Sequence, residues 1–142
     1  MTRLYLLSSE KPSPVPPSVS SKPRRRWRAK FGDAFRGVKL GVRGHSSFFV
    51  HFFLAALVLA AAIVFRCRLL EWCLLLGCIG AVLTAELFNS ALETLFHGLD
   101  EETKPRARPY LDIAAGAVLL VSVSAALVGS LVFVGRLLAL LD

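Results

Sequence analysis

The sequence lacks the patterns that mark several common classes of protein. Its 142 residues contain no GxxxxGK[ST] loop and no other glycine-rich nucleotide loop, which argues against a P-loop or Rossmann site. The three cysteines show no CxxC spacing and have no set of histidines nearby, which argues against a zinc site. The apolar stretch at the N-terminus is short and precedes its basic cluster, so no cleavable signal peptide is expected.

Apolar residues are abundant instead, and they are concentrated in three blocks. Hydrophobic residues make up 55% of the chain, and charged residues lie before and between the blocks. This pattern is typical of an integral membrane protein. The sequence therefore predicts an all-α membrane protein whose spans cover about 47–65, 69–96 and 111–138.

The segment before the first span is predicted to have two parts. Residues 1–23 contain five of the seven prolines together with many serines, which favours a disordered tail. Residues 24–45 mix basic side chains with apolar ones at spacings of three and four, which predicts an amphipathic helix on the membrane surface. Residues 24–142 would then form one membrane domain.

The basic residues predict the orientation of the chain in the bilayer. Of the 17 Lys and Arg residues, fourteen precede the first span or lie between the second and third spans. The positive-inside rule then places the N-terminus and the 97–110 loop in the cytoplasm. Anionic lipid headgroups account for the basic segment more simply than nucleic acid does, so no nucleic-acid partner is expected.

The second predicted span ends in the stretch AELFNSALETL, residues 85–95. On a helix, Glu86, Asn89 and Glu93 share one stripe. Carboxylates near a bilayer are costly unless they face a bundle interior, water or cations. Carboxylates at one depth can bind Mg²⁺ or serve as a general base. The spacing alone fits a proton relay or an interhelical hydrogen-bond seam equally well, and it leaves enzyme and transporter open.

Other features of the spans are interpreted as structural. Gly77, Ala81 and Ala85 recur every four residues and predict close contact with another helix. His51, in the apolar start of the first span, is interpreted as a packing residue.

Three segments resemble one protein family. ELFNSALE, residues 86–93, resembles the E-x-x-N-[ST]-A-[IL]-E signature of the prokaryotic integral-membrane diacylglycerol kinases, which also include undecaprenol kinases, and matches every fixed position. AFRGVKLGVRGHSSFFVHFFLAALVL, residues 34–59, resembles the family's surface helix and first span. DIAAGAVLL, residues 112–120, resembles the start of its third span. The resemblance covers about residues 26–135.

This resemblance implies an activity and an assembly. Members are homotrimers of the bacterial plasma membrane, and their active sites lie at the cytoplasmic interface between subunits. They transfer the γ-phosphate of MgATP to a lipid alcohol. Diacylglycerol, which would give phosphatidic acid, is the first candidate substrate, and undecaprenol is the second.

The resemblance also implies roles for individual residues. By position, Glu86 would be the general base near the acceptor hydroxyl, with Asn89 orienting that region. Glu93 would bind the magnesium ion that bridges the ATP phosphates. The positions implied to lie near the nucleotide or headgroup are Arg26, Arg36, Glu102 and Asp112.

The sequence departs from the family at three positions. His45 stands where a metal-binding Glu is usual, Leu111 where a phosphate-binding Lys is usual, and His97 where an Asp is usual. We expect Arg108, one turn before Asp112, to supply the missing cationic charge, and His45 to bind the metal or a phosphate. A catalytically impaired homologue and a small proton-coupled transporter are the alternatives.

Overall fold

The structure, a computed structural model, describes residues 27–44 and 47–141, which form four helices and no strand. An amphipathic helix, α1 (Trp27–Gly44), comes first. Three helices follow, each long and apolar enough to cross a membrane: α2 (Ser47–Val64), α3 (Leu69–His97) and α4 (Lys104–Leu141). The predicted fold class is confirmed. The predictions for the 1–23 tail, Arg26 and His45 lie outside the described residues.

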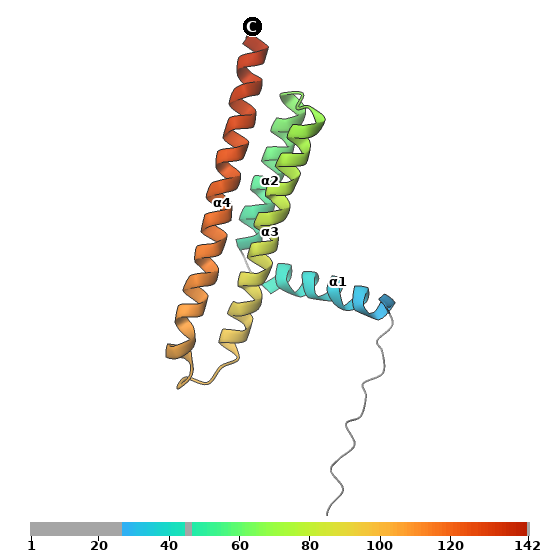
Figure 1. The fold of residues 1–142 in the computed structure, drawn as a ribbon. Coiled ribbons are helices and arrows are strands. Elements are labelled where there is room, and N and C mark those ends of the chain that lie inside the picture. The colour runs from blue at the N-terminus through green and yellow to red at the C-terminus, as the bar shows by residue number, and fades with distance from the viewer. Residues whose placement is uncertain (1–26, 45–46, 142) are drawn as a thin grey trace, which may run out of the picture.

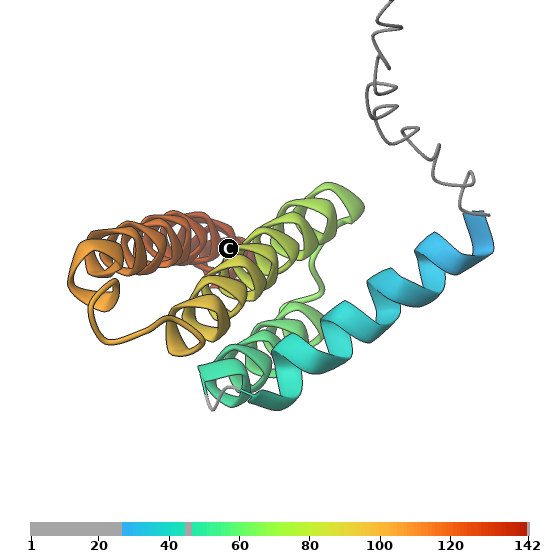
Figure 2. The same ribbon diagram turned by 90° about the horizontal axis from the view of Figure 1, so that it is seen from below.

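The three long helices lie side by side and alternate in direction, while α1 extends sideways from the lower part of α3 (Figure 1). Viewed from below, α1 extends outward on the side away from α4 (Figure 2). The central element is α3, which contacts each of the other three helices. A polar residue on α3 can therefore meet partners from every other element.

Most large apolar side chains point outward. On α2, Phe53 is 69% exposed, and on α4, Leu127 and Leu131 are 63% and 76% exposed. The buried apolar side chains of the described residues are few, namely Phe48, Ala62 and Leu75. An apolar surface of this extent requires lipid or another subunit around it. The exposure pattern therefore agrees with the three candidate spans.

An ion pair holds the bundle together at the end far from α1. The Nε and Nη2 atoms of Arg136 on α4 donate hydrogen bonds to Oε2 of Glu71 on α3, at 2.7 and 2.5 Å. The backbone N–H of Arg68 donates to the same oxygen. One turn before Arg136 on α4, the ring of Phe133 packs on that of Phe65, with centroids 5.7 Å apart. The contacts join the α2–α3 turn to the end of α4.

The hairpin between α3 and α4 differs from expectation, because α4 begins at Lys104, well before residue 111. The Asp100 side chain accepts a hydrogen bond from the backbone N–H of Thr103 at 2.8 Å. Hydrogen bonds from Thr103 hold the pKa of Asp100 below its usual value. Although Pro109 lacks an N–H, the helix continues through it. Asp112, expected at the helix start, consequently lies two turns inside α4.

Candidate active site

Glu86 and Asn89 of the polar cluster predicted on the second span are buried in the structure, together with Ser90. Glu86, Asn89 and Ser90 on α3 are only 3%, 8% and 1% exposed, whereas the neighbouring Phe88 is 70% exposed. In an amphipathic helix of a soluble protein the apolar side chains are buried and the polar ones are exposed, whereas here the polar side chains are buried. Polar groups on a spanning helix are placed in this way when they face the interior of the bundle.

The Glu86 carboxylate is contacted by two side chains of α2. The Ser47 hydroxyl donates a hydrogen bond to Oε1 of Glu86. On the next turn of α2, the Nε2 atom of His51 lies 3.6 Å from Oε2, at the distance of an ion pair. Both oxygens of the buried carboxylate therefore face groups of one helix, which fixes the direction in which the carboxylate points.

Asn89 orients the second carboxylate of the cluster. Its Nδ2 donates a hydrogen bond to Oε1 of Glu93 at 2.8 Å, one turn further along α3. Asn89 is buried, whereas Glu93 is half-buried and lies nearer the hairpin loop. The two carboxylates thus differ in environment: Glu86 is enclosed between helices, and Glu93 lies closer to the loop end of the bundle.

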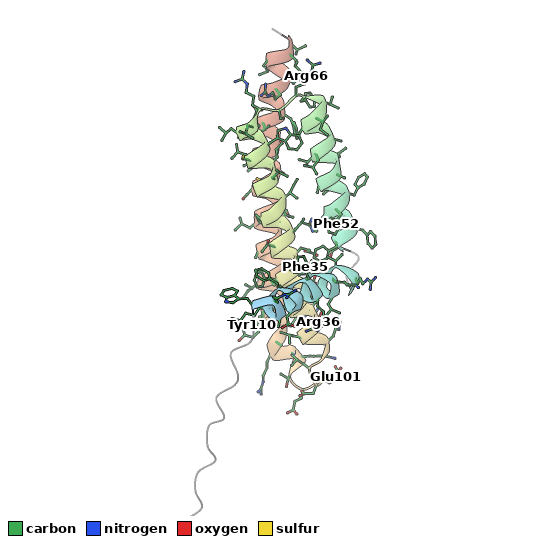
Figure 3. The ribbon with its side chains drawn as sticks, turned by 90° about the vertical axis from the view of Figure 1, so that its right-hand side faces the viewer. Phe35, Arg36, Phe52, Arg66, Glu101 and Tyr110 are labelled. Carbon is green, nitrogen blue, oxygen red and sulfur yellow. The ribbon has the colours of Figure 1, made fainter. Side chains whose placement is uncertain are left out.

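The surface helix lies at the depth of this cluster. Gly41 of α1 packs so closely on α3 that a β-carbon there would overlap Cδ1 of Leu87, the residue after Glu86. Figure 3 shows Arg36 of α1 at about the height of Tyr110 on α4, with Glu101 below and Arg66 at the far end. A helix with many exposed aromatic and basic side chains belongs at the lipid–water boundary. The cluster therefore lies at that boundary.

An apolar cavity of about 400 Å³ adjoins the site. It lies between α2, α3 and α4 and extends from His51, beside Glu86, to Phe133 near the opposite end of the bundle. Its walls include Leu54, Leu75 and Ala126. Such walls suit a hydrocarbon chain whose polar end lies at His51.

The structure unites some of the predicted site residues and separates others. Glu86, Asn89 and Glu93 share one face of α3, as the spacing predicted. Arg36 is exposed on α1 and pairs with Asp33 of its own helix. The remaining described candidates lie exposed in the loop and on α4; they are Glu102, Arg108 and Asp112.

Two residues at the site were not predicted from the sequence. Ser47 by itself carried no signal, because serine is common at helix starts. His51 was interpreted as a packing residue, but the structure places it against Glu86. Ser47 and His51 are four residues apart, about one helical turn, which puts them on one face of α2. That spacing was the available signal, although it does not show which face meets α3.

The site suits magnesium bound together with a phosphate. Within residues 27–44 and 47–141, no three side chains of His, Cys, Asp or Glu converge as a metal cage. Mg²⁺ is usually held by one or two carboxylates and by substrate phosphates, with water completing the shell. Glu93, held by Asn89, fits this mode of binding.

The fold and the site together define a helical membrane protein with a buried carboxylate at the lipid–water boundary. The family model described as "Prokaryotic diacylglycerol kinase" matches residues 32–133. The chain is also 30% identical, over 112 residues, to the undecaprenol kinase of Bacillus subtilis (strain 168), a match that covers 79% of this chain and 91% of that protein. No solved structure matches the chain significantly. The chain belongs to the prokaryotic diacylglycerol kinase family, and it is a membrane lipid kinase that uses ATP.

Proposed function

We propose that this kinase transfers the γ-phosphate of MgATP to the hydroxyl of diacylglycerol and so produces phosphatidic acid. The observation that carries the proposal is the geometry of Glu86. It is a carboxylate 3% exposed, at the depth of the surface helix and beside an apolar cavity. A base in this position meets a lipid hydroxyl from the bilayer side and nucleotide from the water side.

Glu86 acts as the general base. A carboxylate oxygen of Glu86 takes the proton of the lipid hydroxyl as the hydroxyl oxygen attacks phosphorus, and ADP leaves with the former β–γ bridging oxygen. General-base catalysis contributes about 10²–10⁴-fold in rate. The Ser47 hydroxyl supports this role because it holds Oε1 in one orientation.

The nucleotide side of the site is proposed to begin at Glu93. Glu93 binds magnesium, and Asn89 orients its carboxylate. The ion, when bound there, neutralises charge on the ATP phosphates. Exposed side chains on α1, the loop and α4 complete this side in the proposal, namely Arg36, Glu102, Arg108 and Asp112. Arg26 and His45 are included because of the family resemblance alone.

A second candidate substrate is undecaprenol. The specific observation in its favour is the 30% identity to a protein named as an undecaprenol kinase. The apolar cavity accepts an acyl or a prenyl chain on chemical grounds, and both lipids present a primary hydroxyl. The two candidates share the same reaction and the same base.

We also propose where the protein lies in the cell and how its subunits assemble. The chain lies in the bacterial plasma membrane with its N-terminus and the α3–α4 loop in the cytoplasm, in accord with the distribution of its basic residues. It forms a homotrimer. Gly77 and Ala81 of α3 support this, because both are exposed within the chain and Gly77 has no atom near the position of a β-carbon.

The experiment compares the two lipids directly. Purified protein in mild detergent with added phospholipid receives γ-labelled MgATP and either diacylglycerol or undecaprenol. A kcat/KM at least tenfold higher for diacylglycerol supports the first candidate, and the reverse ratio replaces it with the second. Absence of product from a folded protein with either lipid contradicts the proposed activity and indicates an impaired homologue.

A further inference from the structure

His51 occupies a specific place between the base and the cavity. It lies on α2 one turn after Ser47, and its side chain is 18% exposed. Its Nε2 is 3.6 Å from Oε2 of Glu86, and the same side chain lines the apolar cavity. One imidazole therefore contacts both the proposed base and the space that suits the lipid chain.

A buried carboxylate needs donors at both oxygens, because unpaired charge in a low-dielectric site is strongly destabilising. Ser47 serves Oε1 of Glu86. Within the described residues, His51 is the basic side chain that lies within 4 Å of Oε2, with its Nε2 at 3.6 Å. The cavity walls around it carry aliphatic and aromatic side chains, with Ser122 and Ser130 further along α4. Among the residues that the structure describes, Cys78 is the one other titratable side chain that lines that cavity.

We propose that His51 is a positioning residue, whose Nε2 faces Oε2 of Glu86 at 3.6 Å, slightly beyond a direct hydrogen bond, and keeps the carboxylate turned toward the end of the cavity by electrostatic attraction. The inference rests on the proposed function, in which Glu86 is the base. Nε2 carries a proton in one neutral tautomer and in the imidazolium, and it is a donor in both forms. Ser47 and His51 thus fix the base from consecutive turns of α2. The lipid hydroxyl reaches Glu86 beside the imidazole when its chain occupies the cavity.

Three substitutions of His51 separate this role from packing. The amide nitrogen of Gln lies where Nε2 of His lies, whereas the amide of Asn corresponds to Nδ1 and stops short of Glu86. His51→Gln should keep kcat within about threefold of the wild type. His51→Asn and His51→Ala should lower kcat on the order of tenfold, since each removes the N–H dipole that faces the Glu86 carboxylate. The KM for MgATP should not change in any of the three.

Steady-state phosphate transfer measures these values, with thermal unfolding in the same detergent as a check on folding. Phe53→Ala, an exposed position of the same helix, is the matched control and should behave as the wild type. The inference is overturned if His51→Gln falls as far as His51→Ala, if no variant falls, or if the loss lies in the KM for MgATP. A wild-type protein that transfers no phosphate would instead contradict the proposed function, so the two failures are distinguishable.

Discussion

The hydroxyl of Ser47, the first residue of α2, donates a hydrogen bond to the carboxylate of Glu86, which lies 39 residues later on α3. The contact joins the start of one spanning helix to the buried polar part of another. It also lies at the depth where α1 packs against Leu87. The proposed base is therefore fixed by the same helix contacts that set the level of the lipid–water boundary.

Removing the Ser47 hydroxyl should slow catalysis. Hydrogen bonds to charged groups contribute about 1.5–3 kcal/mol, so Ser47→Ala should lower kcat by about tenfold or more. Steady-state transfer from labelled ATP measures this. Ser124→Ala is the matched control, because the Ser124 hydroxyl donates its hydrogen bond to the carbonyl of Leu120 on its own helix. Equal rates in both variants would show that the Ser47 contact does not position the base.

Asn89 should affect activity by orienting Glu93, the proposed magnesium ligand. Asn89→Ala removes the hydrogen bond to Oε1 of Glu93 and should raise the Mg²⁺ concentration for half-maximal activity by about 10–100-fold, the usual cost of losing a group that orients a metal ligand. A magnesium titration at saturating ATP and lipid measures the change. Glu101→Gln, which alters an exposed loop carboxylate, should leave the titration unchanged. An unshifted curve for Asn89→Ala would remove Glu93 from the proposed metal site.

The close approach of α1 to α3 should be sensitive to side-chain size at Gly41. In Gly41→Val the added atoms meet Cδ1 of Leu87, so the Leu87 side chain must leave its rotamer or α1 must shift, and an off-rotamer side chain costs about 0.5–1.5 kcal/mol. We expect a lower unfolding midpoint and reduced transfer activity. Gly32→Val places the same residue on the same helix, where nothing lies within 4 Å of the β-carbon, and thus controls for helix propensity. If the two variants are equally stable, α1 does not pack on Leu87 in the membrane.

The ion pair at the opposite end of the bundle should affect stability but not catalysis. Arg136→Met leaves Glu71 without its Arg136 partner, at a place where the two side chains are only 14% and 25% exposed, and should lower the thermal unfolding midpoint. The KM values for ATP and lipid should not change, because the site lies at the other end of the helices.

A double-mutant cycle with Glu71→Gln tests the pairing. The loss in the double variant should be smaller than the sum of the two single losses. Arg66→Met, an exposed change in the same turn, is the control. Strict additivity would show that Glu71 and Arg136 do not interact in the bilayer.

Periodicity predicted the helices well because hydrophobic length and charge placement are local properties of a chain. The first span was predicted over 47–65 and the second over 69–96, and the helices cover Ser47–Val64 and Leu69–His97. The start of the third helix was predicted too late. The span was predicted from about residue 111, whereas α4 begins at Lys104, directly after a turn in which the Asp100 side chain accepts a hydrogen bond from the N–H of Thr103.

The spacing of the polar cluster also predicted which residues share a face of α3, since that face is set by helix geometry alone. The partners of Glu86 were not predictable in the same way. Which side of α2 meets α3 depends on tertiary packing, and a single histidine in an apolar helix carries no pattern. The contacts of Ser47 and His51 with Glu86 were therefore found only in the structure.

Phosphate transfer by Glu86→Gln tests the central claim most directly, since the substitution keeps the size of the side chain and removes the base. We predict that the wild type transfers labelled γ-phosphate from MgATP to diacylglycerol or undecaprenol, and that Glu86→Gln loses about 10²–10⁴-fold in kcat. The variant should retain its unfolding midpoint and its affinity for MgATP. A folded Glu86→Gln protein with wild-type kcat would contradict the assignment of Glu86 as the catalytic base.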